Sequence, residues 1–167
     1  MGHKEHKEKS PDSVACLVIT VSDTRRKDID TSGGFIKKQL ENSSHKVVDY
    51  FIIKDNIDEI KAGIESGLVN PFVNAVILNG GTGISKRDST YEVVSRIIEK
   101  KIDGFGEIFR RLSYKEIGSA AIMSRAIAGV CKGKIVISMP GSESAVRLAM
   151  KSLILPELAH MVYEANR

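Results

Sequence analysis

The sequence lacks tryptophan, has only two cysteines and four prolines among its 167 residues, and contains no long run of apolar residues. Cys16 and Cys131 lie far apart, and neither has a second cysteine or a histidine at the spacing of a zinc site. We therefore expect two reduced, structural thiols and no zinc. Because a membrane-spanning helix needs about 20 apolar residues, we also expect no membrane partner.

The N-terminal residues 1–13 are almost entirely polar. They are too polar for a secretory signal peptide, so the expected location is cytoplasmic. Their low hydrophobicity predicts a disordered tail, followed by a single domain over residues 14–167. No aromatic residue stands among the lysines of the tail, which argues against a nucleic-acid partner. His3 and His6 in this tail are interpreted as an incidental pair rather than a metal site.

Apolar and polar segments alternate along the rest of the chain. A continuous apolar run at residues 15–21 predicts a strand that is buried on both faces. Residues 46–53, 71–79 and 134–140 predict three further strands. Apolar residues at helical spacing follow the first three of these segments. Strands that alternate with helices predict a three-layer α/β fold, in which an open, mostly parallel sheet is covered by helices on both faces.

Several further helices are predicted. Ser89 to Glu92 fits a capping box in front of one helix. Residues 104–129 predict one or two more helices, and Ser142 is expected to cap a long final helix that is kinked or divided near Pro156. The side chains expected to be buried in residues 104–129 are Ile108, Leu112, Ile117 and Ile122.

Three polar loops follow apolar strands: SDTRR at residues 22–26, NGGTG at 79–83 and MPGSES at 139–144. The carboxyl ends of parallel strands meet at one edge of a sheet, and ligands of open α/β sheets bind at that edge where the strand order reverses. The sequence therefore predicts a ligand site formed by these three loops.

The central loop has two interpretations. Gly80, Gly81 and Gly83 can turn backbone N–H groups toward an anion, and Thr82 adds a hydroxyl group. The same glycines also suit a tight turn between a strand and a helix. The glycines alone favour neither interpretation.

The acidic residues near these loops also have two interpretations. Asp88 fits a ligand of Mg²⁺ or of a hydroxyl group, but it also fits a helix N-cap. Asp55, at the end of the second predicted strand, poses the same choice. Cations near the loops would neutralise an anionic ligand, and one or two of them are expected to contact it. These cations are Arg25, Arg26, Lys86 and Arg87.

Five groups of residues together resemble the MogA/MoaB family of molybdenum cofactor biosynthesis proteins, and the MoaB type most. They are VSDTR with DTSG (21–25, 30–33), NGGTGISKRDST (79–90), GFGEIFRRLSY (104–114), SRAIAGV (124–130) and MPGSESAV (139–146). The resemblance extends from Val14 to the end of the chain and implies the molybdopterin-binding fold of that family. One departure is Ser144, where many relatives have proline.

The resemblance implies an activity and a set of site residues. Active family members adenylylate molybdopterin with ATP and Mg²⁺, releasing pyrophosphate, before molybdenum or tungsten is inserted. By motif, Asp88 and Asp55 would be the catalytic or Mg²⁺-binding carboxylates. The residues that would contact molybdopterin or the nucleotide are Ser22, Asp23, Thr24, Gly80, Gly81, Thr82, Gly83, Arg87, Glu107, Ser124, Arg125, Pro140, Gly141 and Ser142.

The family also implies a homo-oligomer, either a trimer or a hexamer, and the metal-insertion protein of the pathway as a further partner. Two alternatives to an enzyme stay open. One is a non-catalytic carrier of molybdopterin, and the other is a scaffold protein with a vestigial pocket. The presence of both Asp55 and Asp88 favours the enzyme.

Overall fold

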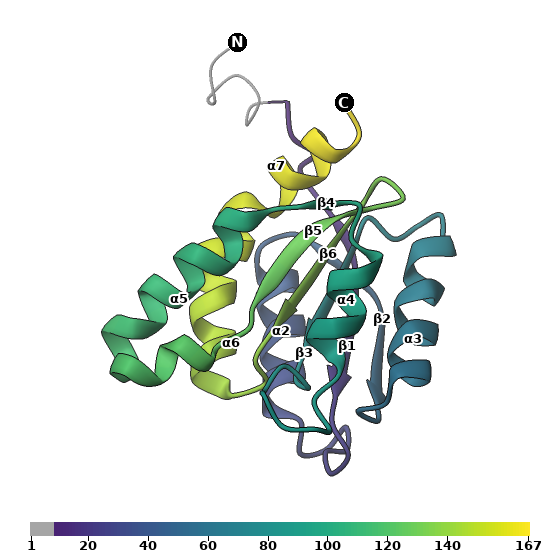
Figure 1. Ribbon diagram of the computed structural model, residues 1–167. Coiled ribbons are helices and arrows are strands. Elements are labelled where there is room, and N and C mark those ends of the chain that lie inside the picture. Colours follow the sequence, from purple (N-terminus) through teal and green to yellow (C-terminus); the bar gives the residue numbers. More distant parts are fainter. Residues whose placement is uncertain (1–8) are drawn as a thin grey trace.

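The computed structural model describes residues 9–167, which fold around a six-stranded sheet (Figure 1). The strands are β1 (Ala15–Val21), β2 (Lys46–Ile53), β3 (Ala75–Asn79), β4 (Lys100–Lys101), β5 (Ile127–Cys131) and β6 (Lys134–Met139). The helices are α2 (Thr31–Asn42), α3 (Ile57–Val69), α4 (Thr90–Ile97), α5 (Asp103–Ile117), the 3₁₀ helix η1 (Gly118–Met123), α6 (Glu143–Ala149), the π-helical segment η2 (Met150–Ile154) and α7 (Leu155–Ala165). The first eight residues of the predicted tail, with His3 and His6, lie outside the described residues.

The strand order is β2-β1-β3-β6-β5-β4. The first four of these strands run parallel, whereas β5 and β4 pair antiparallel at one side. The prediction of a mostly parallel sheet is therefore confirmed. From β1 the chain crosses first to β2 on one side and later to β3 on the other, so the strand order reverses between β1 and β3. Ligands of such sheets bind at this reversal.

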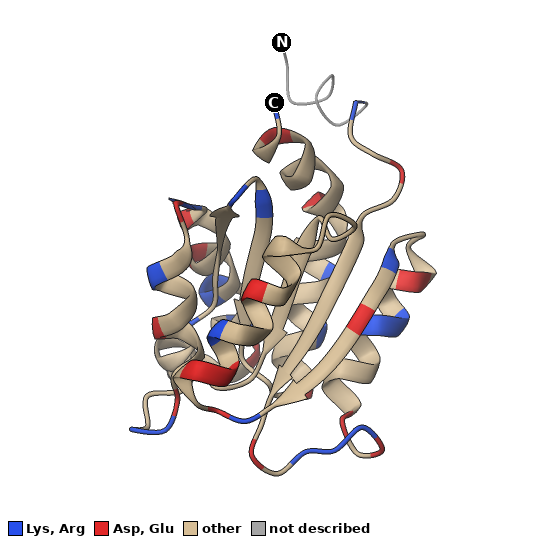
Figure 2. Ribbon diagram, turned by 90° about the vertical axis from the view of Figure 1, so that its right-hand side faces the viewer, with Lys and Arg blue, Asp and Glu red and all other residues tan. Residues whose placement is uncertain are grey.

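The sheet is covered by helices on both faces, as the alternation of apolar residues along β1 illustrates. Cys16 and Val18 pack toward α2, α5 and the C-terminal helices. Leu17 and Ile19 pack toward α3 and α4 on the other face. Figure 1 shows these two helical layers with the sheet between them, which confirms the three-layer prediction. In Figure 2, β1 and β3 carry no charge, whereas acidic and basic residues occupy the loops at the lower end of the molecule.

The third strand begins at Ala75 rather than at residue 71. Asn70 causes this later start. Its side-chain oxygen accepts the N–H of Phe72 at 2.9 Å, and its backbone carbonyl accepts the N–H of Val73 at 3.2 Å. Asparagine side chains that bond the backbone two residues on form turns. Residues 70–73 therefore form a turn before the strand.

The prediction of helices over residues 104–129 is correct as far as Met123 and wrong beyond it. Ile127 begins β5, which pairs antiparallel with β6. The predicted buried side chains are also wrong, because α5 turns a different face to the sheet. Ile108, Ile117 and Ile122 are exposed in the single chain, and Leu112 is half-buried. The buried positions of α5 are instead Phe105, Gly106, Phe109 and Ser113.

The predicted capping box in front of α4 is wrong. Ser89 does precede α4, but its side chain makes no capping hydrogen bond. Glu92, the expected partner, forms an ion pair with Arg125 instead. A tertiary contact therefore replaces the local one.

The division of the final helix is confirmed. The Ser142 hydroxyl accepts the N–H of Ala145 at 3.4 Å and caps α6. The helix then widens into η2 directly before Pro156, which lies in the first turn of α7. Proline has no N–H and its ring crowds the preceding turn, which accounts for the wider turn here. Over residues 9–167 the structure contains no helix that is long and apolar enough to cross a membrane.

Candidate functional site

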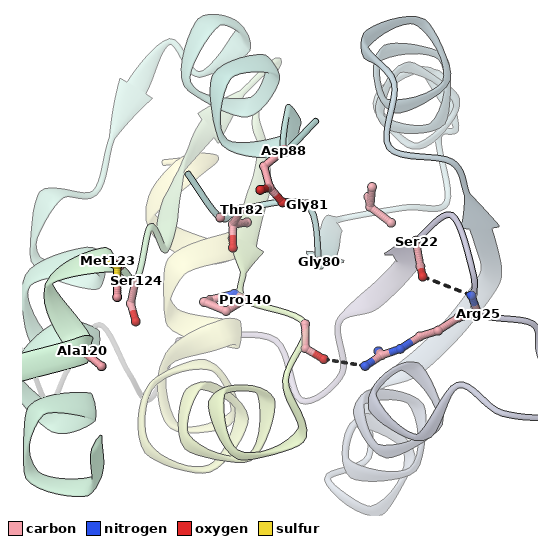
Figure 3. A pocket seen from close by; sticks show the side chains of 13 residues that line it. Ser22, Arg25, Gly80, Gly81, Thr82, Asp88, Ala120, Met123, Ser124 and Pro140 are labelled. Atoms are coloured by element: carbon pink, nitrogen blue, oxygen red, sulfur yellow. Dashed lines mark hydrogen bonds between the residues drawn. The ribbon is translucent and has the colours of Figure 1, made fainter. Parts of the chain in front are cut away.

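A pocket of about 360 Å³ opens at the carboxyl edge of the sheet. Figure 3 shows Ser22 and Arg25 on one side of it and the η1 residues on the opposite side, with the glycine-rich loop between them. The three loops that follow β1, β3 and β6 thus lie together. The pocket is lined by Val21, Ser22, Arg25, Gly80, Gly81, Thr82, Gly83, Asp88, Ala120, Met123, Ser124, Pro140 and Gly141.

The glycine-rich loop has a backbone that only glycine accommodates. Gly80 has φ +95° and Gly81 has φ +65°. A Cβ atom at Gly80 would lie 2.2 Å from the carbonyl oxygen of Val21, and one at Gly81 would lie 2.2 Å from the Thr90 hydroxyl oxygen. The loop therefore passes directly over the end of β1 and the start of α4, so sterics require glycine here. Residues 80–89 separate β3 from α4, however, so the connection is a longer loop and not a tight turn.

The same loop presents unused backbone donors. The N–H of Gly80 donates to the carbonyl of Met139 at 3.0 Å. The N–H groups of Gly81, Thr82 and Gly83 donate to no group within residues 9–167. Consecutive N–H groups without protein partners are typical of anion-binding loops. The anion-binding interpretation is therefore compatible with the steric role of the glycines rather than an alternative to it.

Arg25 is the only cation that lines this pocket among the described residues. One terminal nitrogen, Nη2, donates to the carbonyl oxygen of Gly141 at 3.0 Å, as Figure 3 shows. The other, Nη1, pairs with the carboxylate of Asp30 at 3.3 Å. The remaining N–H donors of the guanidinium stay available to a ligand.

Asp88 and Asp55 are held by the loop that precedes α4. Asp88 lines the pocket, and its Oδ2 accepts the N–H of Ser85 at 2.9 Å. Oδ1 of Asp55 accepts the N–H of Ser89 at 3.1 Å and its hydroxyl at 2.7 Å. The N-cap interpretation of both aspartates is wrong, because Asn56 caps α3 and Ser89 stands at the cap position of α4.

These two carboxylates are the candidates for a metal. They lie against neighbouring glycines, since a Cβ at Gly81 would meet Asp55 at 2.6 Å and one at Gly83 would meet Asp88 at 2.7 Å. The described residues contain no cluster of three or more acidic, histidine or cysteine side chains that would cage a metal ion. Mg²⁺ in nucleotide sites is held by one or two carboxylates together with substrate phosphates. The donor set therefore fits a Mg²⁺ ion that is shared with a phosphate ligand.

Other predicted site residues lie beside the pocket rather than in its lining. Asp23 pairs with Arg87 at 2.5 Å and accepts the N–H of Asp55 at 3.1 Å. The N–H of Thr24 donates to the Ser22 hydroxyl at 3.3 Å. These contacts connect the loop after β1 to the loops before α3 and α4. Arg26 and Lys86, the two remaining cations, are exposed.

Arg125 holds the glycine-rich loop from outside the pocket. Its Nε donates to the carbonyl of Thr82 at 2.9 Å, and its Nη2 donates to the carbonyl of Gly83. Both terminal nitrogens also bond the carboxylate of Glu92, and the guanidinium lies 4.9 Å from the ring centre of Tyr91. Hydrogen bonds from this arginine keep the pKa of Glu92 below its ordinary value. Arg125 therefore contacts the loop, and the structure does not bring it into the pocket.

Glu107 does not line the main pocket. It borders a separate hollow of about 120 Å³ together with Arg110 and Tyr91. Ala120 and Met123 of η1, by contrast, line the main pocket although the sequence reasoning missed them. These two side chains are small or apolar, so no pattern of polar residues marks them as part of a site.

Residues 17–160 match the family described as "Probable molybdopterin binding domain". The chain is 51% identical to the molybdenum cofactor biosynthesis protein B of Bacillus subtilis over 168 residues, an alignment that covers 100% of this chain and 99% of that protein. It is 49% identical to the protein of the same name from Bacillus cereus, with the same coverage.

Solved structures give the same result. A crystal structure of molybdenum cofactor biosynthesis protein B superposes with a TM-score of 0.91 at 49% identity, covering 95% of this chain and 99% of that one. The tungsten cofactor synthesizing protein MoaB of Pyrococcus furiosus superposes with a TM-score of 0.86 at 33% identity, covering 95% of this chain and 100% of that one.

Proposed function

Because the chain belongs to the MogA/MoaB family of molybdenum cofactor biosynthesis proteins, we propose that it transfers the adenylyl group of ATP to molybdopterin. The products are adenylyl-molybdopterin and pyrophosphate. The observation that carries this proposal is the glycine-rich loop, whose three unused N–H groups belong to residues that line the same pocket as Arg25 and Asp88. Donors, a cation and a carboxylate in one pocket suit a phosphate ligand and its Mg²⁺ ion.

The pocket lining suits a reaction between two polyanions. An oxygen of the molybdopterin phosphate attacks the α-phosphorus of ATP, and the bond from that phosphorus to the β-bridging oxygen breaks. The attacking oxygen is already anionic near neutral pH, so no general base is required. In agreement, the lining contains neither histidine nor cysteine. The remaining task is to align the two ligands and to stabilise the charge of the leaving pyrophosphate.

Each chemical group of the pocket has a role in this scheme. The N–H groups of residues 81–83 and the Arg25 guanidinium bind phosphate oxygens. Asp88 in the lining and Asp55, which lies against Gly81 beside it, would hold Mg²⁺, and the ion would supply charge neutralisation to the phosphates. The apolar side chains of Ala120 and Met123 on the opposite wall exclude water from one side of the ligand.

The test is to incubate the protein with molybdopterin, ATP and Mg²⁺ and to detect adenylyl-molybdopterin by chromatography. We expect product from the wild type, and we expect Asp88→Asn to lower turnover by roughly 100-fold or more while the unfolding transition stays the same. Asp58→Asn is the matched control, because Asp58 is an exposed aspartate on α3. Its turnover should equal that of the wild type.

Tight binding of molybdopterin without any product would refute the enzymatic function and support a non-catalytic carrier of molybdopterin. Absence of both binding and turnover would support a scaffold protein with a vestigial pocket. Normal turnover of Asp88→Asn would remove the role given to that carboxylate.

We also propose that the chain forms a homo-oligomer, a trimer or a hexamer. The supporting observation is a group of exposed apolar side chains on α5 and η1, which we term the α5–η1 surface. It consists of Ile108, Tyr114, Ile117, Ile122 and Met123. Large apolar patches on soluble proteins usually mark an interaction surface, and a second copy of the chain would cover this one.

Light scattering tests the oligomer. The wild type should have three or six times the mass of the chain, and Ile117→Asp with Ile122→Asp should be a folded monomer. Phe72→Asp is the control, because Phe72 is 76% exposed but lies outside the α5–η1 surface. A monomeric wild type would contradict the proposal, as would an unchanged mass in the double variant.

A further inference from the structure

Asp30 is the only buried side chain among the aspartates, glutamates, lysines and arginines of residues 9–167. Its Oδ1 accepts the N–H of Gly33 at 3.0 Å, which caps α2. A helix cap needs only that bond, yet the carboxylate accepts three more. The donors are the Thr20 hydroxyl at 2.5 Å, the Tyr50 hydroxyl and Nη1 of Arg25 at 3.3 Å.

These donors keep the buried carboxylate charged. Burial alone would raise the pKa of Asp30, but the hydrogen bonds from Thr20, Tyr50 and Gly33 and the charge of Arg25 together hold it below its ordinary value. Burial and the bond to Asp30 raise the pKa of Tyr50, so the phenol remains a donor. A buried charge with a full set of donors is stiff, because moving it would leave it unpaired.

The Asp30 carboxylate is connected to all three loops of the pocket. Through Arg25 it belongs to the loop after β1, and Arg25 in turn donates to the Gly141 carbonyl in the loop after β6 at 3.0 Å. Ser32, two residues after Asp30, donates to the same carbonyl at 2.9 Å. The amide of Asn79, which precedes the glycine-rich loop, donates to the Thr20 hydroxyl at 2.9 Å.

We propose that Asp30 is a positioning residue for the adenylyl transfer, which acts through Arg25 and the Gly141 carbonyl. Its charge fixes the orientation of the only cation in the described pocket lining, and its contacts hold the three loops in register before a ligand arrives. Because these groups are already ordered, ligand binding does not have to offset the entropy cost of ordering them. This inference rests on the proposed function, since it names how that site is prepared for its anionic substrate.

The test compares two variants that touch the same carboxylate. Asp30→Asn keeps the size of the side chain and the helix cap, because asparagine caps helices as well as aspartate does, but it removes the charge that anchors Arg25. Tyr50→Phe removes one hydrogen bond from Asp30 without altering Arg25. Calorimetric titration with molybdopterin should show roughly five- to tenfold weaker binding for Asp30→Asn and less than about twofold for Tyr50→Phe.

The free energy of unfolding in urea separates positioning from stability. If Asp30 had only a structural role, the loss of molybdopterin affinity would be proportional to the loss of stability, with the same proportion in Asp30→Asn and Tyr50→Phe. That result would overturn the inference. Stronger binding by Asp30→Asn would overturn it too, because Asp30 would then merely neutralise Arg25. If Asp30→Asn does not fold, Asp30→Ser replaces it, since serine also caps helices.

A double-mutant cycle shows whether Asp30 acts through Arg25. In the Arg25→Ala background, Asp30→Asn should change molybdopterin affinity by less than about twofold, because the group that it positions is already gone. A loss as large as in the wild-type background would contradict the inference.

A measurement without ligand keeps this inference separate from the proposed function. Nitrogen-15 relaxation of the Arg25 Nε–H group should report a rigid side chain in the wild type and in Tyr50→Phe, and a mobile one in Asp30→Asn. Equal rigidity in all three proteins would refute the coupling. A wild type that binds no molybdopterin would refute the proposed function, while the relaxation data would still decide whether Asp30 orders Arg25.

Discussion

Two arginines hold the loops of the pocket, and they differ in how they are anchored. Arg25 holds the Gly141 carbonyl and is anchored by Asp30, whose side chain is completely buried. Arg125 holds the carbonyls of residues 82 and 83 and is anchored by Glu92, whose side chain is 43% exposed. The chemical arrangement is the same in both: a carboxylate, a guanidinium and the carbonyl oxygens of a loop.

The difference lies in the solvent exposure of the carboxylate that anchors each arginine, and in whether the arginine lines the pocket. An exposed ion pair contributes about 0–1 kcal/mol and weakens with salt, whereas the buried carboxylate of Asp30 is bonded on all sides. Arg25 also lines the pocket, but Arg125 lies behind its loop. We therefore expect ligand binding to depend strongly on Arg25 and weakly on Arg125.

The largest effect is expected from the loop that Arg125 holds. Gly80→Ala should lower the free energy of unfolding by more than the ~1–3 kcal/mol of ordinary backbone strain, because its Cβ would lie 2.2 Å from the Val21 carbonyl. Urea unfolding measures this. Gly104→Ala is the control, since a Cβ there meets nothing within 4 Å. Equal stability of the two variants would show that the loop does not pack as described.

The next prediction compares how much each of the two arginines contributes to molybdopterin binding. Arg25→Ala should weaken molybdopterin binding by about 10- to 100-fold, because charge-assisted hydrogen bonds contribute ~1.5–3 kcal/mol. Arg125→Ala should weaken it only a few-fold, and Arg96→Ala, an exposed control on α4, should not change it. Titration calorimetry gives the three affinities. Equal losses at Arg25 and Arg125 would erase the distinction between the two anchors.

A smaller effect is expected at Glu92, the carboxylate that anchors Arg125. Glu92→Gln should lower stability by at most ~1 kcal/mol, and the difference from the wild type should vanish in 1 M salt, which screens exposed charges. The effect of Asp30→Asn should persist in the same salt. Urea unfolding at low and high salt checks both statements, and a salt-resistant effect at Glu92 would contradict its exposed character.

The last effect is local and lies away from both arginines, directly before β1. Nδ1 of His45 accepts the N–H of Val14 at 3.1 Å, and burial lowers the pKa of His45 from 6.5. The His45 imidazole is therefore protonated at a higher pH in the unfolded chain than in the folded chain. Its contribution to stability is complete above pH 6.5 and is lost as the pH falls through the folded pKa, by at most ~1.4 kcal/mol per pH unit.

Unfolding measured between acidic and neutral pH tests this prediction. His45→Gln should flatten the part of the profile that His45 causes, because glutamine does not titrate. An identical profile in the variant would show that other groups cause the acid sensitivity.

Much of the fold was predictable from the apolar segments. The run at residues 15–21 coincides with β1, which is buried on both faces, and residues 46–53 coincide with β2, which is the less buried edge strand. Their parallel pairing follows from the helices between them, and with it the place of the three loops. β5 was missed because its sequence, IAGVC, is short and mixes strand and helix formers.

The candidate site was less predictable wherever a contact joins distant residues. Glu92 fits a local cap by spacing, but Arg125 lies 33 residues away and pairs with it in the folded chain. Asp30 belongs to a recognisable motif, yet its donors Thr20 and Tyr50 come from two different strands. No periodicity or spacing rule contains such pairings.

The structure of the protein in complex with molybdopterin and Mg²⁺ tests the central claim most directly. We predict that the molybdopterin phosphate lies within hydrogen-bond distance of the N–H groups of residues 81–83 and of the Arg25 guanidinium, with Mg²⁺ on Asp88. Molybdopterin bound elsewhere, or bound in this pocket with its phosphate turned away from the glycine-rich loop, would contradict the account.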